Sequence, residues 1–163
     1  MDEKQVKNAQ FTYQSNQIAT ASKEQLLLIT YDIGIRSCRL AEAAIVQQNI
    51  EETNRHVQKA QDVIRELMFS LNVEVGGEVA ENLMRLYDFL YYELVDGNVR
   101  KDPEKVRVVR SMLEELRTTW EQAIEKLFRT IRDEPDAFAP KERWAMDWYY
   151  PVLCGVVREE AGH

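Results

Sequence analysis

The chain has 163 residues, which is enough for one domain built around a single hydrophobic core. Hydrophobic residues make up 45% of it and charged residues 30%, and only four prolines and six glycines interrupt it, a composition that favours long helices. The net charge of −7 argues against a nucleic-acid-binding protein, which normally presents a basic surface, but it leaves protein partners open.

The N-terminal residues and the cysteines indicate where the protein works. Residues 1–10 are polar and lack the apolar segment of a signal peptide. No apolar run approaches the roughly 18 residues that a membrane span needs. The two cysteines, Cys38 and Cys154, are too few and too far apart for a disulfide framework or a zinc site. We therefore expect a cytoplasmic protein with reduced thiols and no contact with membranes.

The first predicted helix runs from about Ser22 to Gln48. Ser22 and Gln25 have the spacing of a capping box, in which each side chain bonds the backbone amide of the other residue. Apolar or small residues then recur at spacings of three and four, which is typical of a buried helix face. Gly34 and Cys38 lie on that face, so we expect a close helix approach at Gly34 and a small core residue at Cys38.

Two further apolar runs surround a pair of glycines. The first run includes Val57, Ile64 and Leu71, and the second begins near Ala80 and includes Tyr87, Leu90 and Leu94. Gly76 and Gly77 stand between them, and glycine readily adopts the positive φ that a tight helix–helix turn requires. We expect these two helices to fold back on each other at the glycines, and the second to end at Asp96-Gly97-Asn98 or to break near it.

The fourth predicted helix begins at Asp102 and Pro103, as N-cap and first helical residue, and Pro135 ends it. Its apolar positions run from Val106 to Ile131 at helical spacing. Short links join all the helices, so sequential neighbours should be antiparallel. The sequence therefore predicts an all-α, antiparallel up-down four-helix bundle over residues 1–133.

A C-terminal extension of different character, residues 134–163, follows the predicted bundle. It contains two of the three tryptophans, Trp144 and Trp148, followed by Tyr149 and Tyr150. Aromatic side chains at this density are expected to be covered. The extension could pack on the flank of the bundle, bind a partner or form an oligomer contact.

The sequence offers little chemistry for catalysis, metals or cofactors. A di-metal bundle needs Glu-x-x-His pairs, whereas Glu52 precedes His56 by four residues and the other histidine is His163. No nucleophile elbow, phosphate-binding loop or dinucleotide-binding motif is present. We expect no enzyme activity and no cofactor, and a solvated helix position for His56.

The third predicted helix has more large apolar residues than one buried stripe can accommodate. Leu83, Met84, Leu86, Tyr87, Phe89, Leu90, Tyr91, Tyr92, Leu94 and Val95 cover most of its circumference. A helix that is apolar nearly all round needs neighbours on more than one side. These residues could close the core and its ends, or contact the C-terminal extension, a second copy of the chain, or an amphipathic helix of a partner.

Several short stretches, taken together and in order, resemble one family. They are Thr-Tyr-Gln at 12–14, Ala-Thr-Ala-Ser at 19–22, Gln-Leu-Leu-Leu at 25–28, Thr-Tyr-Asp at 30–32, Lys-Ala-Gln-Asp-Val-Ile-Arg-Glu-Leu at 59–67, Ser-Leu-Asn at 70–72, Gly-Gly-Glu at 76–78, Asn-Leu at 82–83, Leu-Tyr-Asp-Phe-Leu at 86–90 and Glu-Leu-Arg-Thr-Thr-Trp at 115–120. The ordered set resembles FliS, the flagellar secretion chaperone, over about residues 13–127. Family members usually end soon after this region, and this chain continues for more than 30 residues.

The resemblance implies a helical bundle that binds the disordered C-terminal segment of flagellin, prevents its premature polymerisation and keeps it ready for the flagellar export apparatus. Tyr13 would belong to an N-terminal cap segment at one end of the binding groove. The other expected groove residues are Tyr31, Ile64, Leu67, Leu71, Leu83, Tyr87, Leu90 and Tyr91.

Two questions stay open at this point. One hypothesis is that residues 144–157 lie in the groove until flagellin displaces them. The competing reading of the chain is a structural bundle that buries its apolar third helix in a homodimer and does not bind flagellin, so the chain could be a monomer or a homodimer.

Overall fold

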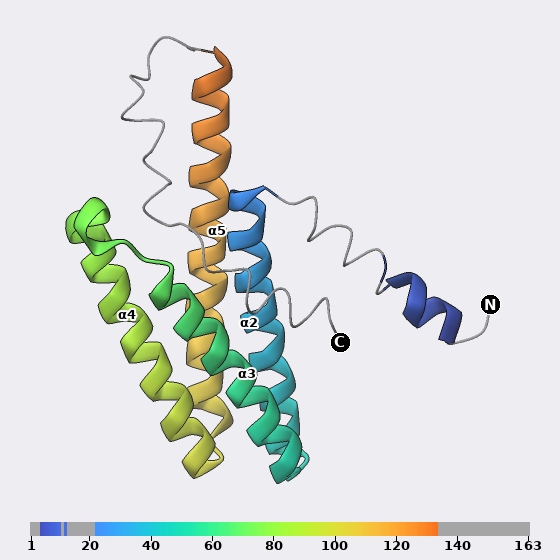
Figure 1. The fold of residues 1–163 in the computed structure, drawn as a ribbon. Coiled ribbons are helices and arrows are strands. Elements are labelled where there is room, and N and C mark those ends of the chain that lie inside the picture. Colours follow the sequence, from blue (N-terminus) through green and yellow to red (C-terminus); the bar gives the residue numbers. More distant parts are fainter. Residues whose placement is uncertain (1–3, 11, 13–21, 134–163) are drawn as a thin grey trace.

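The computed structural model describes residues 4–10, 12 and 22–133, apart from the side chain of residue 131. Four long helices follow one another: α2 (Lys23–Val46), α3 (Ile50–Phe69), α4 (Val73–Arg100) and α5 (Pro103–Asp133). Each helix packs against its neighbours in the order α2, α3, α4, α5 and back to α2 (Figure 1). This arrangement confirms the predicted antiparallel bundle. Residues 4–10 are also helical, while Tyr13 and the C-terminal extension lie outside the described residues.

Polar side chains cap the start of each long helix. Ser22 and Gln25 form the predicted capping box, with nitrogen–oxygen distances of 2.9 and 3.3 Å. Asn49 accepts from the Glu52 amide at the start of α3, and Asn72 accepts from the Val75 amide at the start of α4. Asp102 accepts from the Glu104 amide and Pro103 is the first residue of α5, as predicted. These bonds satisfy amides that have no partner within a helix and so fix where each helix begins.

The turn between α3 and α4 agrees with the prediction only in part. The Asn72 cap starts α4 at Val73, before the two glycines, and the positive φ predicted for the glycine pair is found at Gly77. Among the described glycines only Gly77 has a positive φ, of 55° with ψ of −138°, and it interrupts α4 as a kink. Gly77 therefore separates a short first turn from the long part of α4, while Gly76 does not supply the predicted positive φ.

We expect Gly77→Ala to lower the free energy of unfolding by about 1–3 kcal/mol, because a Cβ atom disfavours this region of φ and ψ. No atom lies within 4 Å of where that Cβ would stand, so the cost comes from the backbone and not from a clash. Chemical denaturation of the variant measures it. Gly76→Ala is the matched control. It should change the free energy of unfolding by less than about half of the change in Gly77→Ala.

The end of α4 also lies later than predicted. The helix continues through Gly97 to Arg100, and Lys101 in the left-handed conformation ends it. The amide of Asp102 then bonds the carbonyl oxygen of Gly97 at 2.9 Å. Gly97 is instead a point of close contact, because a Cβ atom there would stand 3.1 Å from the Lys105 Cβ.

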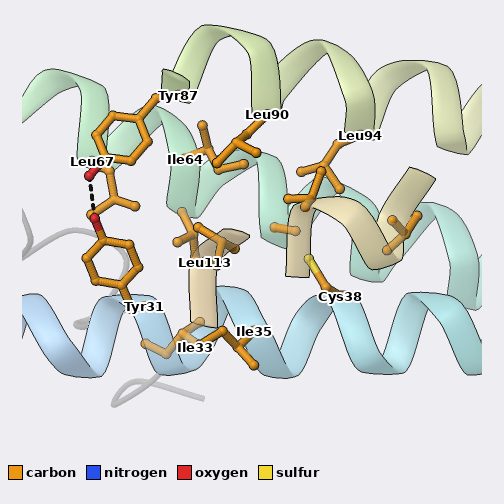
Figure 2. Close-up of a cluster of buried hydrophobic side chains, with 14 of the residues drawn as sticks. Tyr31, Ile33, Ile35, Cys38, Ile64, Leu67, Tyr87, Leu90, Leu94 and Leu113 are labelled. Carbon is orange, nitrogen blue, oxygen red and sulfur yellow. Dashed lines mark hydrogen bonds between the residues drawn. The ribbon is translucent and has the colours of Figure 1, made fainter. Parts of the chain in front are cut away.

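The core runs along the bundle axis and is built from the predicted apolar faces (Figure 2). A Cβ atom on Gly34 would stand 2.9 Å from Val63 Cγ1 and 3.3 Å from Leu113 Cδ1, which confirms the predicted close approach. Cys38 is fully buried, also as predicted, and points into the core between the helices (Figure 2). The core therefore joins α2, α3, α4 and α5 in one unit.

Burial raises the pKa of the Cys38 thiol to about 12, and the nearby Glu42 carboxylate adds to the shift. The thiolate is the reactive form, so we expect Cys38 to resist alkylation at pH 8 in the native protein. In a Cys154→Ser variant, which leaves Cys38 as the only thiol, iodoacetamide should react at least roughly 100-fold more slowly in buffer than in denaturant. Comparable rates under the two conditions would show that α2 opens readily.

Candidate partner-binding surface

Three aromatic side chains from three helices meet through their polar atoms inside the bundle. The hydroxyls of Tyr31 on α2 and Tyr87 on α4 bond each other in the core (Figure 2). Trp120 on α5 donates from Nε1 to the same Tyr31 hydroxyl at 3.1 Å. Both tyrosines are fully buried. This bonded group satisfies polar atoms that would be costly to bury alone and fixes the position of α4 relative to α2 and α5.

The structure brings most of the sequence-predicted groove residues together, but inside the bundle. Tyr31, Ile64, Leu67, Tyr87 and Leu90 are fully buried and Leu71 is nearly so. Leu83 and Tyr91 are half-buried against the same core, and Tyr13 lies outside the described residues. Of the eight predicted groove residues that the structure describes, only Leu83 and Tyr91 are partly exposed to solvent. A direct contact of any of them with a partner stays a prediction.

Tyr91 lies at the edge of the core where α4 meets α3. The guanidinium carbon of Arg65 on α3 lies 6.0 Å from the centre of its ring, and the Tyr92 ring stands edge-on to it at 6.2 Å. The Arg65 cation thus contacts Tyr91 from α3, while Tyr92, the next residue of α4, packs against the same ring. Tyr92 itself continues outward and is 64% exposed.

Most of the remaining large apolar side chains of α4 are exposed, and they are spread over more than one side of the helix. The exposed fraction is 59% for Val79, 47% for Phe89, 64% for Tyr92 and 76% for Val99. We define the α4 apolar surface as these four residues with Val95 and the half-buried Leu83, Leu86 and Tyr91. It spans about 30 Å of helix, from residue 79 to residue 99 at about 1.5 Å per residue. The predicted excess of apolar residues on this helix is confirmed.

Phe89 and Tyr92 were recognised as part of that excess but were not among the predicted groove residues. Apart from Tyr91, the predicted α4 residues follow the three-and-four spacing of the α4 stripe, which is the buried side of the helix. The apolar residues that break this spacing are the exposed ones. Apolar residues that lie off the regular spacing are therefore the sequence feature that identifies the exposed surface.

The opposite seam of the bundle, between α2 and α5, is closed by ion pairs. Arg110 on α5 bonds Glu42 at 2.6 Å and Glu114 at 3.2 Å, and Glu114 also bonds Arg39 on α2 at 2.9 Å. The Glu42 carboxylate holds the pKa of Arg110 above its usual value. Burial opposes ionisation of Glu114, but the bonds from Arg39 and Arg110 hold its pKa below the usual range. This seam offers charged groups that already have partners, whereas α4 offers apolar ones.

The described residues contain little that could do chemistry. His56 is not the solvated residue that the sequence suggested: its side chain is 17% exposed and its Nε2 lies 3.2 Å from a Glu52 oxygen. Within the described ranges no three His, Cys, Asp or Glu side chains gather in a way that could hold a metal ion. None of the helices described is long and apolar enough to cross a membrane.

Fold and surface together define a class: an antiparallel helical bundle that exposes several large apolar side chains on one helix. The comparison with known families is specific within that class. The family model described as flagellar protein FliS matches residues 6–127. The chain belongs to the FliS family.

Individual relatives agree with this assignment. The flagellar secretion chaperone FliS of Bacillus subtilis is 32% identical over 120 residues, which is 74% of this chain and 89% of that protein. The flagellar secretion chaperone FliS of Vibrio cholerae is 30% identical over 107 residues, 66% of this chain and 79% of that protein. A mannosidase of Mycolicibacterium hassiacum is 33% identical over 103 residues, but this match covers only 28% of that protein. The enzyme activity of that mannosidase therefore gives no information about the function of this chain.

Proposed function

We propose that this chain is a cytoplasmic export chaperone that binds the disordered C-terminal segment of flagellin, prevents its premature polymerisation and keeps it competent for secretion. Membership of the FliS family and relatives named flagellar secretion chaperones support this role. The structural observation that carries it is the α4 apolar surface, with Phe89, Tyr92 and Val99 about half exposed or more.

An amphipathic helix of the client suits this surface. Such a helix places apolar residues at spacings of three and four along one side, and the α4 apolar surface offers about 30 Å of apolar side chains along one axis. Ordering a disordered segment costs about 2–5 kcal/mol of the gross interaction free energy, which the burial of apolar side chains must exceed. The client's own apolar stripe would then be covered and unable to drive polymerisation.

The predicted groove residues divide into two roles in this proposal. Leu83 and Tyr91, which are half-buried at the edge of the core, are proposed to contact the client directly. The buried set holds α4 in place from beneath; it consists of Tyr31, Ile64, Leu67, Leu71, Tyr87 and Leu90. Tyr13 is proposed to act within an N-terminal cap segment. No residue is assigned a catalytic role.

Co-expression with a C-terminal flagellin fragment, followed by a pull-down and size-exclusion chromatography, tests the proposal. We expect a stable 1:1 complex, with the free chain eluting separately. A homodimer whose elution does not change when flagellin is added would contradict the proposal and support the structural, self-associating alternative. In cells, loss of the chain should reduce flagellin secretion by the export apparatus while its synthesis continues.

We also propose that residues 134–163 form an extension distinct from the bundle domain of residues 1–133. The family match ends at residue 127, and the extension carries the aromatic group around Trp144 and Trp148. These aromatic side chains could cover the same kind of surface as a client helix. The hypothesis is that residues 144–157 occupy the α4 apolar surface until flagellin displaces them.

Deleting residues 136–163 is then expected to tighten the binding of a flagellin C-terminal peptide. If the extension occupies the surface in about nine of ten molecules, its removal improves the apparent Kd about tenfold. Isothermal titration calorimetry of the full chain and the deletion variant measures the difference. An unchanged or weaker affinity would rule out competition by the extension.

A further inference from the structure

One side of α4 carries a row of residues whose spacing is symmetric about its middle. We define the α4 outer row as Glu81, Arg85, Phe89, Tyr92, Asp96 and Arg100. Successive members are four, four, three, four and four residues apart, which keeps them on one side of an α-helix over about 28 Å. All are exposed except Asp96, which is half-buried, and α4 lies at an edge of the bundle (Figure 1). The row is therefore open to a partner along its whole length.

The charges of the α4 outer row differ between its two halves. Glu81 and Arg85 form no ion pair with any residue that the structure describes. Asp96 and Arg100 bond each other at 2.8 Å, and Lys105 lies 3.0 Å from the other oxygen of Asp96. Because the second half is already paired, a partner's charges would gain little affinity there. They would instead decide in which direction and register a partner can lie.

A second copy of α4 running in the opposite direction matches the row at every position. A two-fold axis between the two aromatic residues makes these contacts: Glu81 with Arg100, Arg85 with Asp96, and Phe89 with Tyr92 of the second copy. A shift by one helical turn in one direction would oppose the carboxylates of Glu81 and Asp96. A shift in the other direction would oppose the guanidinium groups of Arg85 and Arg100. A parallel arrangement would set each charge against its equal, so the row favours one antiparallel register.

We propose that chains without a client pair through their α4 outer rows in a weak antiparallel homodimer, and that client and second copy exclude each other. The exclusion rests on the proposed function, because both occupants cover Phe89 and Tyr92, whereas the dimer itself does not. Two helices touching over this length bury less than the roughly 1,200–2,000 Å² of a stable complex, so the dimer forms and separates readily. Pairing covers exposed aromatic side chains until a client replaces the second copy.

Sedimentation velocity of the full chain without flagellin, from about 1 to 200 µM, tests the dimer in the concentration range of weak interfaces. We expect a monomer–dimer equilibrium. Glu81→Lys and Arg100→Glu should each raise the dissociation constant at least roughly tenfold, because each substitution opposes like charges twice across the axis. An equimolar mixture of the two variants should restore the dimer, because position 81 of either chain then meets an opposite charge at position 100 of the other.

Glu115→Lys and Lys126→Glu are the matched controls, because they make the same changes of charge at exposed positions of α5. Alone or mixed, they should leave the dissociation constant unchanged, and thermal unfolding checks that every variant is folded. A monomer at every concentration, equal weakening by the α5 variants, or no restoration in the mixture would overturn the proposed dimer. Deleting residues 136–163 should not weaken the dimer; its loss would place the contact on the extension and also overturn it.

A C-terminal flagellin fragment tests the exclusion separately from the dimer. Added to the dimer, it should produce 1:1 complexes as the dimer disappears. A complex that contains flagellin and two paired chains would overturn the exclusion. If the fragment does not bind but the mixed variants still restore the dimer, the proposed function fails and the dimer is supported. If the fragment binds a chain that is always monomeric, the dimer fails and the proposed function is supported.

Discussion

Replacing Tyr87 with alanine is expected to lower the free energy of unfolding by about 3–5 kcal/mol, the range seen for large aromatic residues truncated in a core. The Tyr87 ring is fully buried and its hydroxyl bonds that of Tyr31, which also accepts from Trp120. The substitution therefore leaves a cavity and removes a partner of a buried hydroxyl. Because natural domains have only about 5–15 kcal/mol of stability, urea denaturation should show a large loss.

Conservative variants separate the hydroxyl from the ring. Tyr87→Phe leaves the Tyr31 hydroxyl with one partner fewer, and Tyr31→Phe does the same to the Tyr87 hydroxyl and to Trp120 Nε1; each should cost about 1–2 kcal/mol. The double variant should cost less than the sum, because either single variant already removes the bond between the two hydroxyls. Tyr92→Ala is the matched control: its side chain is largely exposed, so the stability should change by less than about 0.5 kcal/mol. Additive costs in the double variant would mean that the two hydroxyls do not interact.

The order and packing of the helices follow from local features of the sequence. Ser22 with Gln25, and Asp102 with Pro103, mark helix starts that the structure confirms. The apolar spacing identifies the core face of each helix, and Gly34 identifies the closest approach of α2 to its neighbours. These signals act over one or two turns of a helix, and for that reason the sequence alone reveals them.

The turns were harder to predict because competing residues stand close together. Asn72 caps a first short turn of α4 before the chain reaches the glycines, and the positive φ of Gly77 then separates this turn from the long part of the helix. At the other end of α4, Lys101 adopts the left-handed conformation and Gly97 stays helical, the reverse of their ordinary preferences. Packing decides this case, since Gly97 is needed where α4 touches the side chains of Lys105 and Val106.

The candidate site was predicted at the level of a helix but not of individual residues. The excess of apolar residues on α4 pointed to the correct element, yet the residues selected for binding were chiefly those on its regular stripe. A regular stripe is what a bundle buries, as the positions of Tyr87 and Leu90 show. Phe89 and Tyr92 lie off that stripe, and only the packing of α3 and α5 against α4 shows that they remain exposed.

Introducing two charges on the α4 apolar surface is expected to abolish most client binding and leave the fold intact. Phe89→Glu combined with Tyr92→Glu places carboxylates where the proposed client helix buries apolar side chains. Large aromatic side chains commonly dominate the binding energy of such surfaces. We expect the Kd for a flagellin C-terminal fragment to rise at least roughly 100-fold, or about 2.7 kcal/mol.

Val108→Glu provides the control, because it adds one carboxylate at an exposed valine on α5. Glutamate is a good helix former and all three positions are exposed, so thermal unfolding of both variants should stay close to that of the unmodified chain. Calorimetry should show that the control retains full affinity. If the double variant binds flagellin normally while Val108→Glu does not, the client lies on α5, and the α4 apolar surface must have another purpose. Because the control carries its added charge on a different helix, the comparison tests the location of the surface separately from the proposed function.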